Sequence, residues 1–268
     1  MTQSSSKGFA LITGASSGIG AVYADRLAHE GYDLILVARN RERLEQLAAR
    51  LGNATQRTVE VVQADLNNSG DLARIAQILE QDQRINLLVN NAGVGASASL
   101  LESEQAKMDA MIHLNVVALT HLAKAAATNF VARAEGTIIN IASIVAIAPE
   151  LLNGVYGGTK AFVLAFTQSL HHELSEKGVK VQAVLPGAIS TEFWDIAGLP
   201  IQHLPGEIVM NSEDLVDAAL AGLALGELVT IPSLPDIADW QAFEQARLAL
   251  KPNLSHKVAA ARYLINAR

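Results

Sequence analysis

Tyr156 and Lys160 stand four residues apart in the stretch YGGTK, a spacing that puts both side chains on one face of a helix. A free phenol has a pKa of about 10 and is a poor proton-transfer group at neutral pH. A lysine ammonium about 4 Å away, at an effective dielectric near 20, favours the phenolate by about 4 kcal/mol, or roughly three pKa units. The pair therefore predicts a tyrosine with a pKa of about 7 that acts as a general acid or base.

The context of this pair supports a catalytic role, although such a pair can also arise by chance. Lys160 falls in the first turns of a helix expected over 155–177, where its charge opposes the helix dipole. Gly157 and Gly158 each cost about 1 kcal/mol relative to alanine there. Local violations of this kind are expected at functional sites. We hypothesise that the two glycines let a cofactor or a neighbouring helix approach closely.

A glycine-rich turn, TGASSGIG, joins the first apolar run to a helical pattern. Gly14, Gly18 and Gly20 supply residues that tolerate positive φ, and the backbone amides from Ser17 onward lie at a helix N-terminus, where phosphate binds. A turn of this kind between a first strand and a first helix predicts a dinucleotide site.

Arg39 lies nineteen residues after Gly20, at the end of the second expected strand. The residue at this place distinguishes the two nicotinamide cofactors. An acidic residue would bind a ribose 2′-hydroxyl, whereas a guanidinium pairs with a 2′-phosphate. Arg39 therefore predicts NADP(H), the alternative being a solvated arginine of the kind that Arg41 and Arg43 illustrate.

The elements that must position these residues follow from short apolar runs that alternate with helical patterns such as 41–51 and 70–82. Continuous apolar strands imply burial on both faces of a parallel sheet. We expect an α/β fold, a doubly wound, mainly parallel seven-stranded sheet with helices on both faces (Rossmann-like). The expected strands are 9–13, 32–38, 58–64, 85–90, 136–142, 179–185 and 228–232.

The chain is expected to form a single domain over 1–268, because 268 residues suit one large core. The segment 189–212 lacks a period and is interpreted as an irregular substrate loop at the carboxyl edge of the sheet. Its residues Phe193, Trp194, Ile196 and Leu199 either pack the loop or cover the substrate. Beyond it, 236–268 is expected to form a C-terminal extension of two helices divided at Pro252.

Composition excludes several functions. A formal net charge of −7 without clustered Lys or Arg argues against nucleic-acid binding. No run of eighteen uncharged apolar residues or signal peptide is present, so a cytoplasmic protein without membrane spans is expected. Cysteine is absent, and the adjacent His171 and His172 point in different directions on a helix, so we expect no metal site.

The order of motifs resembles the short-chain dehydrogenase/reductase family, in its short single-domain branch, over about residues 8–232. It comprises TGASSGIG, NNAG at 90–93, Asn115, Ser143, Tyr156 with Lys160, and PGAIST at 186–191. The resemblance implies that Tyr156 exchanges the substrate proton, that Lys160 lowers its pKa and binds the nicotinamide ribose, and that Ser143 polarises the substrate carbonyl. Asn115 would hold a water that links Lys160 to solvent.

The same resemblance implies a set of cofactor-binding residues, which begins in the glycine-rich turn and ends in the PGAIST motif. They are Gly14, Ser16, Ser17, Gly18, Ile19, Gly20, Arg39, Asp65, Leu66, Asn90, Ala92, Gly93, Tyr156, Lys160, Pro186, Gly187, Ile189 and Thr191. The family more often has Ser or Ala where Gly157 and Gly158 stand, which puts the packing near the substrate in question. It also suggests a homodimer or homotetramer built from helices around 104–134 and 155–177.

The sequence thus predicts an NADP(H)-dependent carbonyl reductase or alcohol dehydrogenase. Its substrate would be a small apolar molecule, because the loop 189–212 and the segment IVAIAPELL (144–152) are both rich in apolar residues. One alternative is a protein that senses NADP(H) or binds a partner without turnover, which would tolerate loss of Tyr156, Lys160 or Ser143. Another is an epimerase or dehydratase of the extended branch, which usually carries a larger C-terminal region.

Overall fold

The computed structural model describes residues 6–263. Within them the chain forms two compact units, divided between Pro232 and Ser233. The first unit contains the whole sheet and every predicted site residue. The second contains one α-helix and short helical turns.

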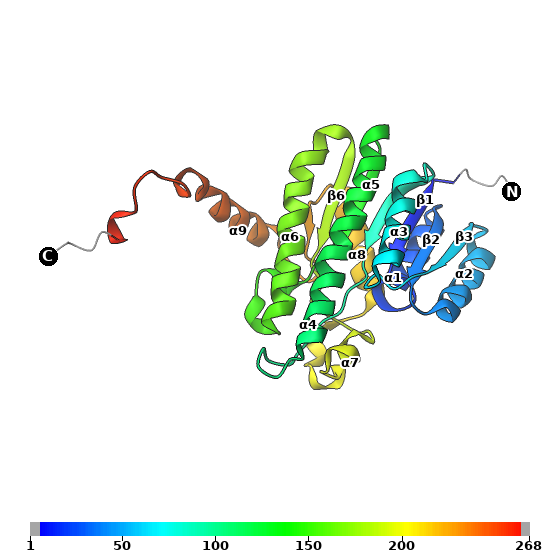
Figure 1. Ribbon diagram of the computed structural model, residues 1–268, viewed down its shortest axis with the longest axis horizontal. Coiled ribbons are helices and arrows are strands. Elements are labelled where there is room, and N and C mark those ends of the chain that lie inside the picture. Colours follow the sequence, from blue (N-terminus) through cyan, green and yellow to red (C-terminus); the bar gives the residue numbers. More distant parts are fainter. Residues whose placement is uncertain (1–5, 264–268) are drawn as a thin grey trace. The chain divides into compact units, whose positions relative to one another are not determined.

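A seven-stranded parallel sheet forms the centre of the first unit (Figure 1). Its strand order, β3-β2-β1-β4-β5-β6-β9, reverses direction between β1 and β4, and ligands of open α/β sheets bind at such a switch point. The predicted fold is confirmed, with each strand within two residues of its expected bounds. The strands are β1 (Phe9–Thr13), β2 (Asp33–Ala38), β3 (Val59–Gln63), β4 (Ile85–Asn90), β5 (Gly136–Ile141), β6 (Val179–Val184) and β9 (Val229–Thr230).

Both faces of the sheet are buried, which explains the continuous apolar strands. In β1, Leu11 packs into one hydrophobic cluster and Ile12 into the other. One face is covered by α1 (Gly18–His29), α2 (Arg41–Thr55) and α8 (Ser212–Leu225). The other is covered by α3 (Ser69–Gln81), α5 (Leu119–Arg133) and α6 (Gly154–Leu174). Alternate side chains along a strand point to opposite faces, so both sets must be apolar.

A long apolar helical run extends over Gln105–Arg133 and is, by length and composition alone, able to cross a membrane. It consists of α4 (Gln105–Ile112), a π-helical segment (His113–Ala118) and α5. Leu122, Ala126 and Phe130 of α5 belong to the hydrophobic cluster on the sheet, and half of the apolar window is buried. Packing against the sheet therefore accounts for the buried half of this apolar window.

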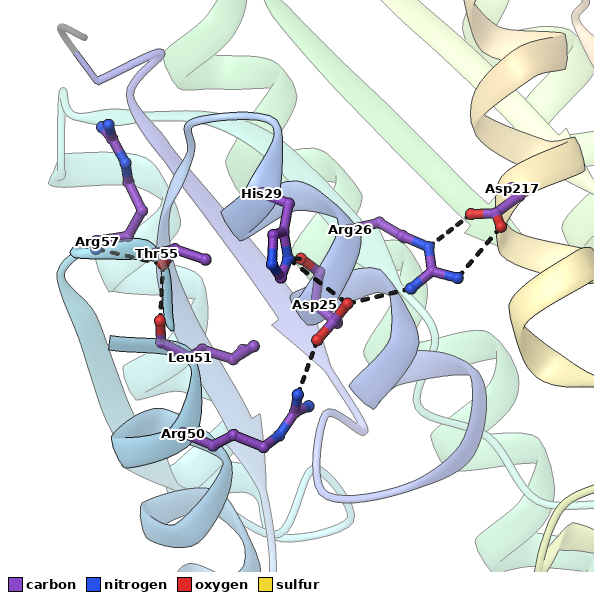
Figure 2. Close-up of polar contacts among 8 residues, drawn as sticks. All are labelled: Asp25, Arg26, His29, Arg50, Leu51, Thr55, Arg57 and Asp217. Atoms are coloured by element: carbon purple, nitrogen blue, oxygen red, sulfur yellow. Dashed lines mark hydrogen bonds and ion pairs between the residues drawn. The ribbon is translucent and has the colours of Figure 1, made fainter. Parts of the chain in front are cut away.

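Ion pairs fasten α1 to α8 and α2 on one face of the sheet (Figure 2). Arg26 of α1 donates through Nε to one oxygen of Asp217 at 2.6 Å and through Nη2 to the other at 3.2 Å. Asp25 accepts from both Arg26 and Arg50. A hollow of about 460 Å³ beside Arg26 is lined by Arg26, His29, Glu30, Asp217, Leu220 and Ala221, none of which is a predicted site residue. These contacts set helix positions.

The segment 189–212 is more ordered than the irregular loop that its sequence predicts. It begins in β7 (Ala188–Ile189), which pairs with β8 (Val209–Met210) near its end. Between them lie α7 (Phe193–Ala197) and the 3-10 turns Ile201–His203 and Gly206–Ile208. The β7–β8 pairing is non-local, which is why a search for local periodicity misses it.

The second unit contains α9 (Ile237–Ala249), whose first turn is capped by Asp236 through a 2.9 Å hydrogen bond from the amide of Ala238. The prediction of a second helix after Pro252 is wrong within the described residues, which show only the 3-10 turns Lys251–Asn253 and Ala261–Tyr263. Residues 250–263 are all exposed. A short helix without a packing surface is marginal in water, which explains the difference. Residues 264–268 of that prediction lie outside the described part of the chain.

Candidate active site

The glycine-rich turn between β1 and α1 depends on glycine at three positions. Gly14 and Gly18 have φ of +65° and +52°, a left-handed region that favours glycine. A Cβ on Gly20 would lie 2.4 Å from the carbonyl oxygen of Gly14. Ser17 is the N-cap of α1 and makes no side-chain capping bond, so the first amides of the helix are available to an anion. Ser16 and Ser17 are half-buried in this turn, as is Ile19, which packs against the core below it.

Asn91, directly after the neighbouring strand β4, fixes this turn, a role that sequence reasoning missed. Its side-chain amide donates to the carbonyl oxygens of Thr13 at 2.9 Å and Gly14 at 3.3 Å. The hydroxyl of Thr13 in turn accepts from the amides of Asn91 and Ala92, both at 3.0 Å. The adjacency of β1 and β4 in the strand order brings these residues together, and the repeated Asn in NNAG is the signal that could have indicated it.

Asn90, predicted beside the cofactor ribose, has its side chain in the core. It donates to Asn140 of β5 at 3.0 Å and is 3% exposed. The side-chain amide of Asn140 in turn donates a hydrogen bond to the hydroxyl of Thr167 in α6 at 3.0 Å. This side chain therefore joins β4, β5 and α6, and only its backbone lies at the strand end.

Arg39 lies exposed directly after β2, and its guanidinium makes no hydrogen bond or ion pair within residues 6–263. Its neighbours differ. Arg41 pairs with Glu45 at 2.7 Å, and Arg43 pairs with Glu192 of the segment before α7 at 2.7 Å. Of these three arginines, Arg39 is therefore the one that forms no ion pair with a carboxylate of the described residues. Asp65 and Leu66 follow the adjacent strand β3, where the Asp65 carboxylate accepts from the amide of Asn67 and Leu66 is buried.

Tyr156 is held in the first turn of α6 by the cap of that helix. The side chain of Asn153 accepts hydrogen bonds from the amides of Val155 at 2.9 Å and Tyr156 at 3.2 Å. Tyr156 is 5% exposed, and its phenol interacts with the hydroxyl of Ser143, which follows β5. The predicted catalytic tyrosine and serine therefore meet at the carboxyl edge of the sheet.

The expected effect of Lys160 on the tyrosine is wrong for this arrangement. Burial raises the pKa of Tyr156 to about 12, and the interaction with Ser143 offsets only part of this rise. Burial also lowers the pKa of Lys160 to about 8. The Lys160 Nζ lies 5.8 Å from the Tyr156 ring centroid and donates to the carbonyl oxygen of Ile141 at 2.8 Å. Desolvation therefore dominates, because the ammonium is bonded elsewhere.

Asn115 lies in the π-helical segment between α4 and α5, a distortion that is frequent at functional sites. Its side chain is 1% exposed, accepts from the amide of Val94 at 3.0 Å and donates to the Val94 carbonyl at 2.9 Å and to Thr159 at 3.1 Å. Gly93 completes this corner. A Cβ there would lie 3.1 Å from Asn115 Oδ1 and 3.5 Å from Lys160 Nζ.

The PGAIST motif contacts both Ser143 and the glycine-rich turn. The Pro186 carbonyl accepts from the amide of Ile144 at 2.9 Å and from the Ser143 hydroxyl at 3.4 Å. Gly187 leads from there into β7, where the buried Ile189 offers its carbonyl to Trp194. The Thr191 side chain lies 3.1 Å from the place of a Cβ on Gly18. The motif therefore connects the glycine-rich turn to Ser143.

The two glycines of YGGTK differ in their surroundings. A Cβ on Gly157 would lie 3.1 Å from Cβ of Pro149, in the 3-10 turn Pro149–Leu151. A Cβ on Gly158 would meet no atom of the described chain within 4 Å. Close approach of a neighbouring segment thus accounts for Gly157, and nothing in the described residues accounts for Gly158.

An apolar cluster surrounds the phenol. Met111 and Val145 are buried with Tyr156, and Val94, Ala96, Leu152, Val155 and Phe193 pack against them. Ser143, Tyr156 and Lys160 in this apolar setting, beside the glycine-rich turn, are typical of a dinucleotide-dependent oxidoreductase.

Comparison with known proteins agrees with this class. The model of the short chain dehydrogenase family matches residues 8–197. An uncharacterized oxidoreductase of Staphylococcus epidermidis is 36% identical over 185 residues, which are 68% of this chain and 78% of that protein. The chain belongs to the short-chain dehydrogenase/reductase family and is an oxidoreductase.

Solved structures show the same fold at higher identity. The short-chain dehydrogenase from Sphingobium yanoikuyae in complex with NADPH is 48% identical, with a TM-score of 0.93 over 96% of this chain and 99% of that chain. The bulky-bulky ketone specific alcohol dehydrogenase from Comamonas testosteroni, in its orthorhombic crystal form, is 44% identical, with a TM-score of 0.89 over the same shares.

Proposed function

We propose that this protein is an NADPH-dependent carbonyl reductase, or alcohol dehydrogenase in the reverse direction, for ketones with large apolar substituents. The observation that carries the proposal is the buried Tyr156, whose phenol interacts with Ser143 and packs among apolar side chains. The similar proteins support it, since one was solved with NADPH and another is specific for bulky-bulky ketones.

The residues present fit NADP(H). The open amides at the start of α1 suit the pyrophosphate, and the unpaired guanidinium of Arg39 suits a 2′-phosphate. Gly93 leaves a space beside Lys160 that a Cβ would fill, which suits the nicotinamide ribose. When bound, NADPH would supply the hydride for the carbonyl carbon.

Tyr156 is set up to give a proton rather than to take one. With a pKa of about 12 the phenol keeps its proton at neutral pH, so it can donate to the substrate oxygen as negative charge develops there. Ser143 interacts with the same phenol and can hold the substrate oxygen beside it. Lys160, with a pKa of about 8, is mostly protonated at pH 7 and can stabilise the phenolate that remains.

Cofactor preference tests the first half of the proposal. Arg39→Asp should reverse the preference, lowering kcat/KM with NADPH about 10- to 100-fold relative to NADH, because a charge-assisted hydrogen bond contributes about 1.5–3 kcal/mol. Arg41→Asp is the matched control, since that arginine already pairs with Glu45. An unchanged NADPH preference in Arg39→Asp would contradict the assignment.

Turnover tests the second half. NADPH oxidation should be measured with a panel of small aldehydes, dialkyl ketones, aryl ketones and diketones, and we expect the highest kcat/KM with the ketones that carry two large apolar groups. Tight NADPH binding without oxidation by any member would instead favour a sensor. We further propose a homodimer or homotetramer built from α4–α5 and α6, which light scattering would test.

A further inference from the structure

We propose that Gly95 and Phe193 together determine how large a ketone the site accepts. The proposal rests on the proposed function and deepens it, because it names the residues that would make room for two large substituents. Phe193 is the first residue of α7 and is half-buried in the apolar cluster around Tyr156. The Phe193 ring packs against the backbone of Gly95, which has no side chain.

The contact between these two residues leaves no space for a side chain at position 95. A Cβ on Gly95 would lie 2.3 Å from Cζ of Phe193 and 3.0 and 3.1 Å from its two Cε atoms. The ring therefore lies directly against Gly95. Its centroid is 5.8 Å from that of Tyr156, within the usual range for an aromatic pair. Gly95 thus allows the ring to stand back from the phenol as far as it does.

Trp194 has a different role from its neighbour. It is 7% exposed, and its indole Nε1 donates to the carbonyl oxygen of Ile189 at 2.8 Å. Its ring meets the ring of Phe193 edge-on at 5.6 Å. Trp194 is therefore an anchor that fixes α7 and blocks Phe193 from moving to that side.

Two further contacts hold α7 in place. Ser97 donates to the carbonyl oxygen of Ala197 through its amide at 3.0 Å and its hydroxyl at 2.7 Å. At the other end, Glu192 pairs with Arg43. A Phe193 ring displaced from Gly95 is thus held back on the Trp194 side and by both ends of α7. On this proposal the displaced ring moves toward Tyr156, whose ring centroid is 5.8 Å away and beside which the substrate carbonyl would lie.

Gly95→Ala tests this proposal against wild type. We expect the ratio of kcat/KM for a ketone with two large groups, such as benzil, to that for a small ketone, such as cyclohexanone, to fall at least about 10-fold, one extra methyl in a tight pocket being worth about 10- to 200-fold. Gly206→Ala is the control, because a Cβ there meets no atom of the described chain within 4 Å.

A second change separates a narrowed site from a damaged one. Adding Phe193→Ala to Gly95→Ala removes the displaced ring and should restore the benzil to cyclohexanone ratio, with NADPH affinity unchanged in all variants. If Gly95→Ala does not fold, Phe193→Trp in the wild-type background should lower the same ratio. An unchanged ratio in Gly95→Ala, or a double variant that stays as selective as Gly95→Ala, would overturn the proposal. Failure of wild type to reduce either ketone would instead refute the proposed function.

Discussion

Two glycine-bearing segments flank the site, and their glycines serve opposite purposes. In the turn of residues 13–20, positive φ at Gly14 and Gly18 and the close carbonyl at Gly20 make each glycine necessary. In YGGTK, both glycines are helical, one faces Pro149 and the other faces open space. The first segment presents backbone amides, so we expect cofactor binding there to depend on the backbone conformation that its glycines allow. The second presents the Tyr156 and Lys160 side chains, so we expect its glycines to tolerate substitution with little effect on the proposed chemistry.

The largest effect should come from Gly20→Ala. A Cβ there would lie 2.4 Å from the Gly14 carbonyl oxygen and 2.6 Å from Asn91 Nδ2, so the backbone itself would have to shift. We expect a loss of about 3 kcal/mol in stability, and about 100-fold weaker NADPH binding where the variant folds. Denaturant unfolding and fluorescence titration with NADPH measure the two effects. Normal NADPH affinity in this variant would contradict the claim that the glycines of residues 13–20 are necessary while those of YGGTK are not.

Lys160 gives the second test, through the pH dependence of stability. Its folded pKa of about 8 lies below the ordinary 10.5, so the unfolded chain binds more protons between these values. The cost of burying this lysine is therefore complete below pH 8 and is relieved as pH rises toward 10.5. We expect the stability of Lys160→Met relative to wild type to fall by about 2–3 kcal/mol from pH 7 to pH 10.

Urea unfolding at several pH values measures this difference. The lost hydrogen bond to Ile141 adds an offset that does not depend on this titration. Lys177→Met, at an exposed lysine just after the same helix, is the control and should show no such trend. A relative stability of Lys160→Met that stays flat from pH 7 to 10 contradicts a lowered lysine pKa.

The smallest effects should come from the glycines of YGGTK. Gly158→Ala adds a methyl into open space in an exposed helix turn and should stabilise the protein by up to about 1 kcal/mol. Gly157→Ala gains the same helix propensity but presses on Pro149 at 3.1 Å, so it should be about 1 kcal/mol less stable than Gly158→Ala. Thermal unfolding compares the pair. Light scattering of Gly158→Ala shows whether a partner subunit covers this position, in which case the variant would be destabilised.

The fold was predictable because the parallel sheet leaves a local signature, the continuous apolar strands buried on both faces. Several site residues were predictable for the same reason, since the glycine-rich turn, Arg39 and Ser143 each follow the end of a strand. The pKa of Tyr156 was not, because it depends on burial and on the bond from Lys160 to Ile141, which sequence spacing does not show. The role of Asn91 and the β7–β8 pair were missed because both depend on non-local contacts.

Replacement of Tyr156 by Phe tests the central claim most directly. The change removes one oxygen from a phenol that supplies no helix cap and keeps the ring that packs against Phe193. Single-turnover oxidation of NADPH with a ketone that wild type reduces should slow by about 10²- to 10⁴-fold, the usual size of a general acid contribution, while the Kd for NADPH stays nearly unchanged. Turnover at close to the wild-type rate would show that the proton comes from elsewhere and would contradict the account.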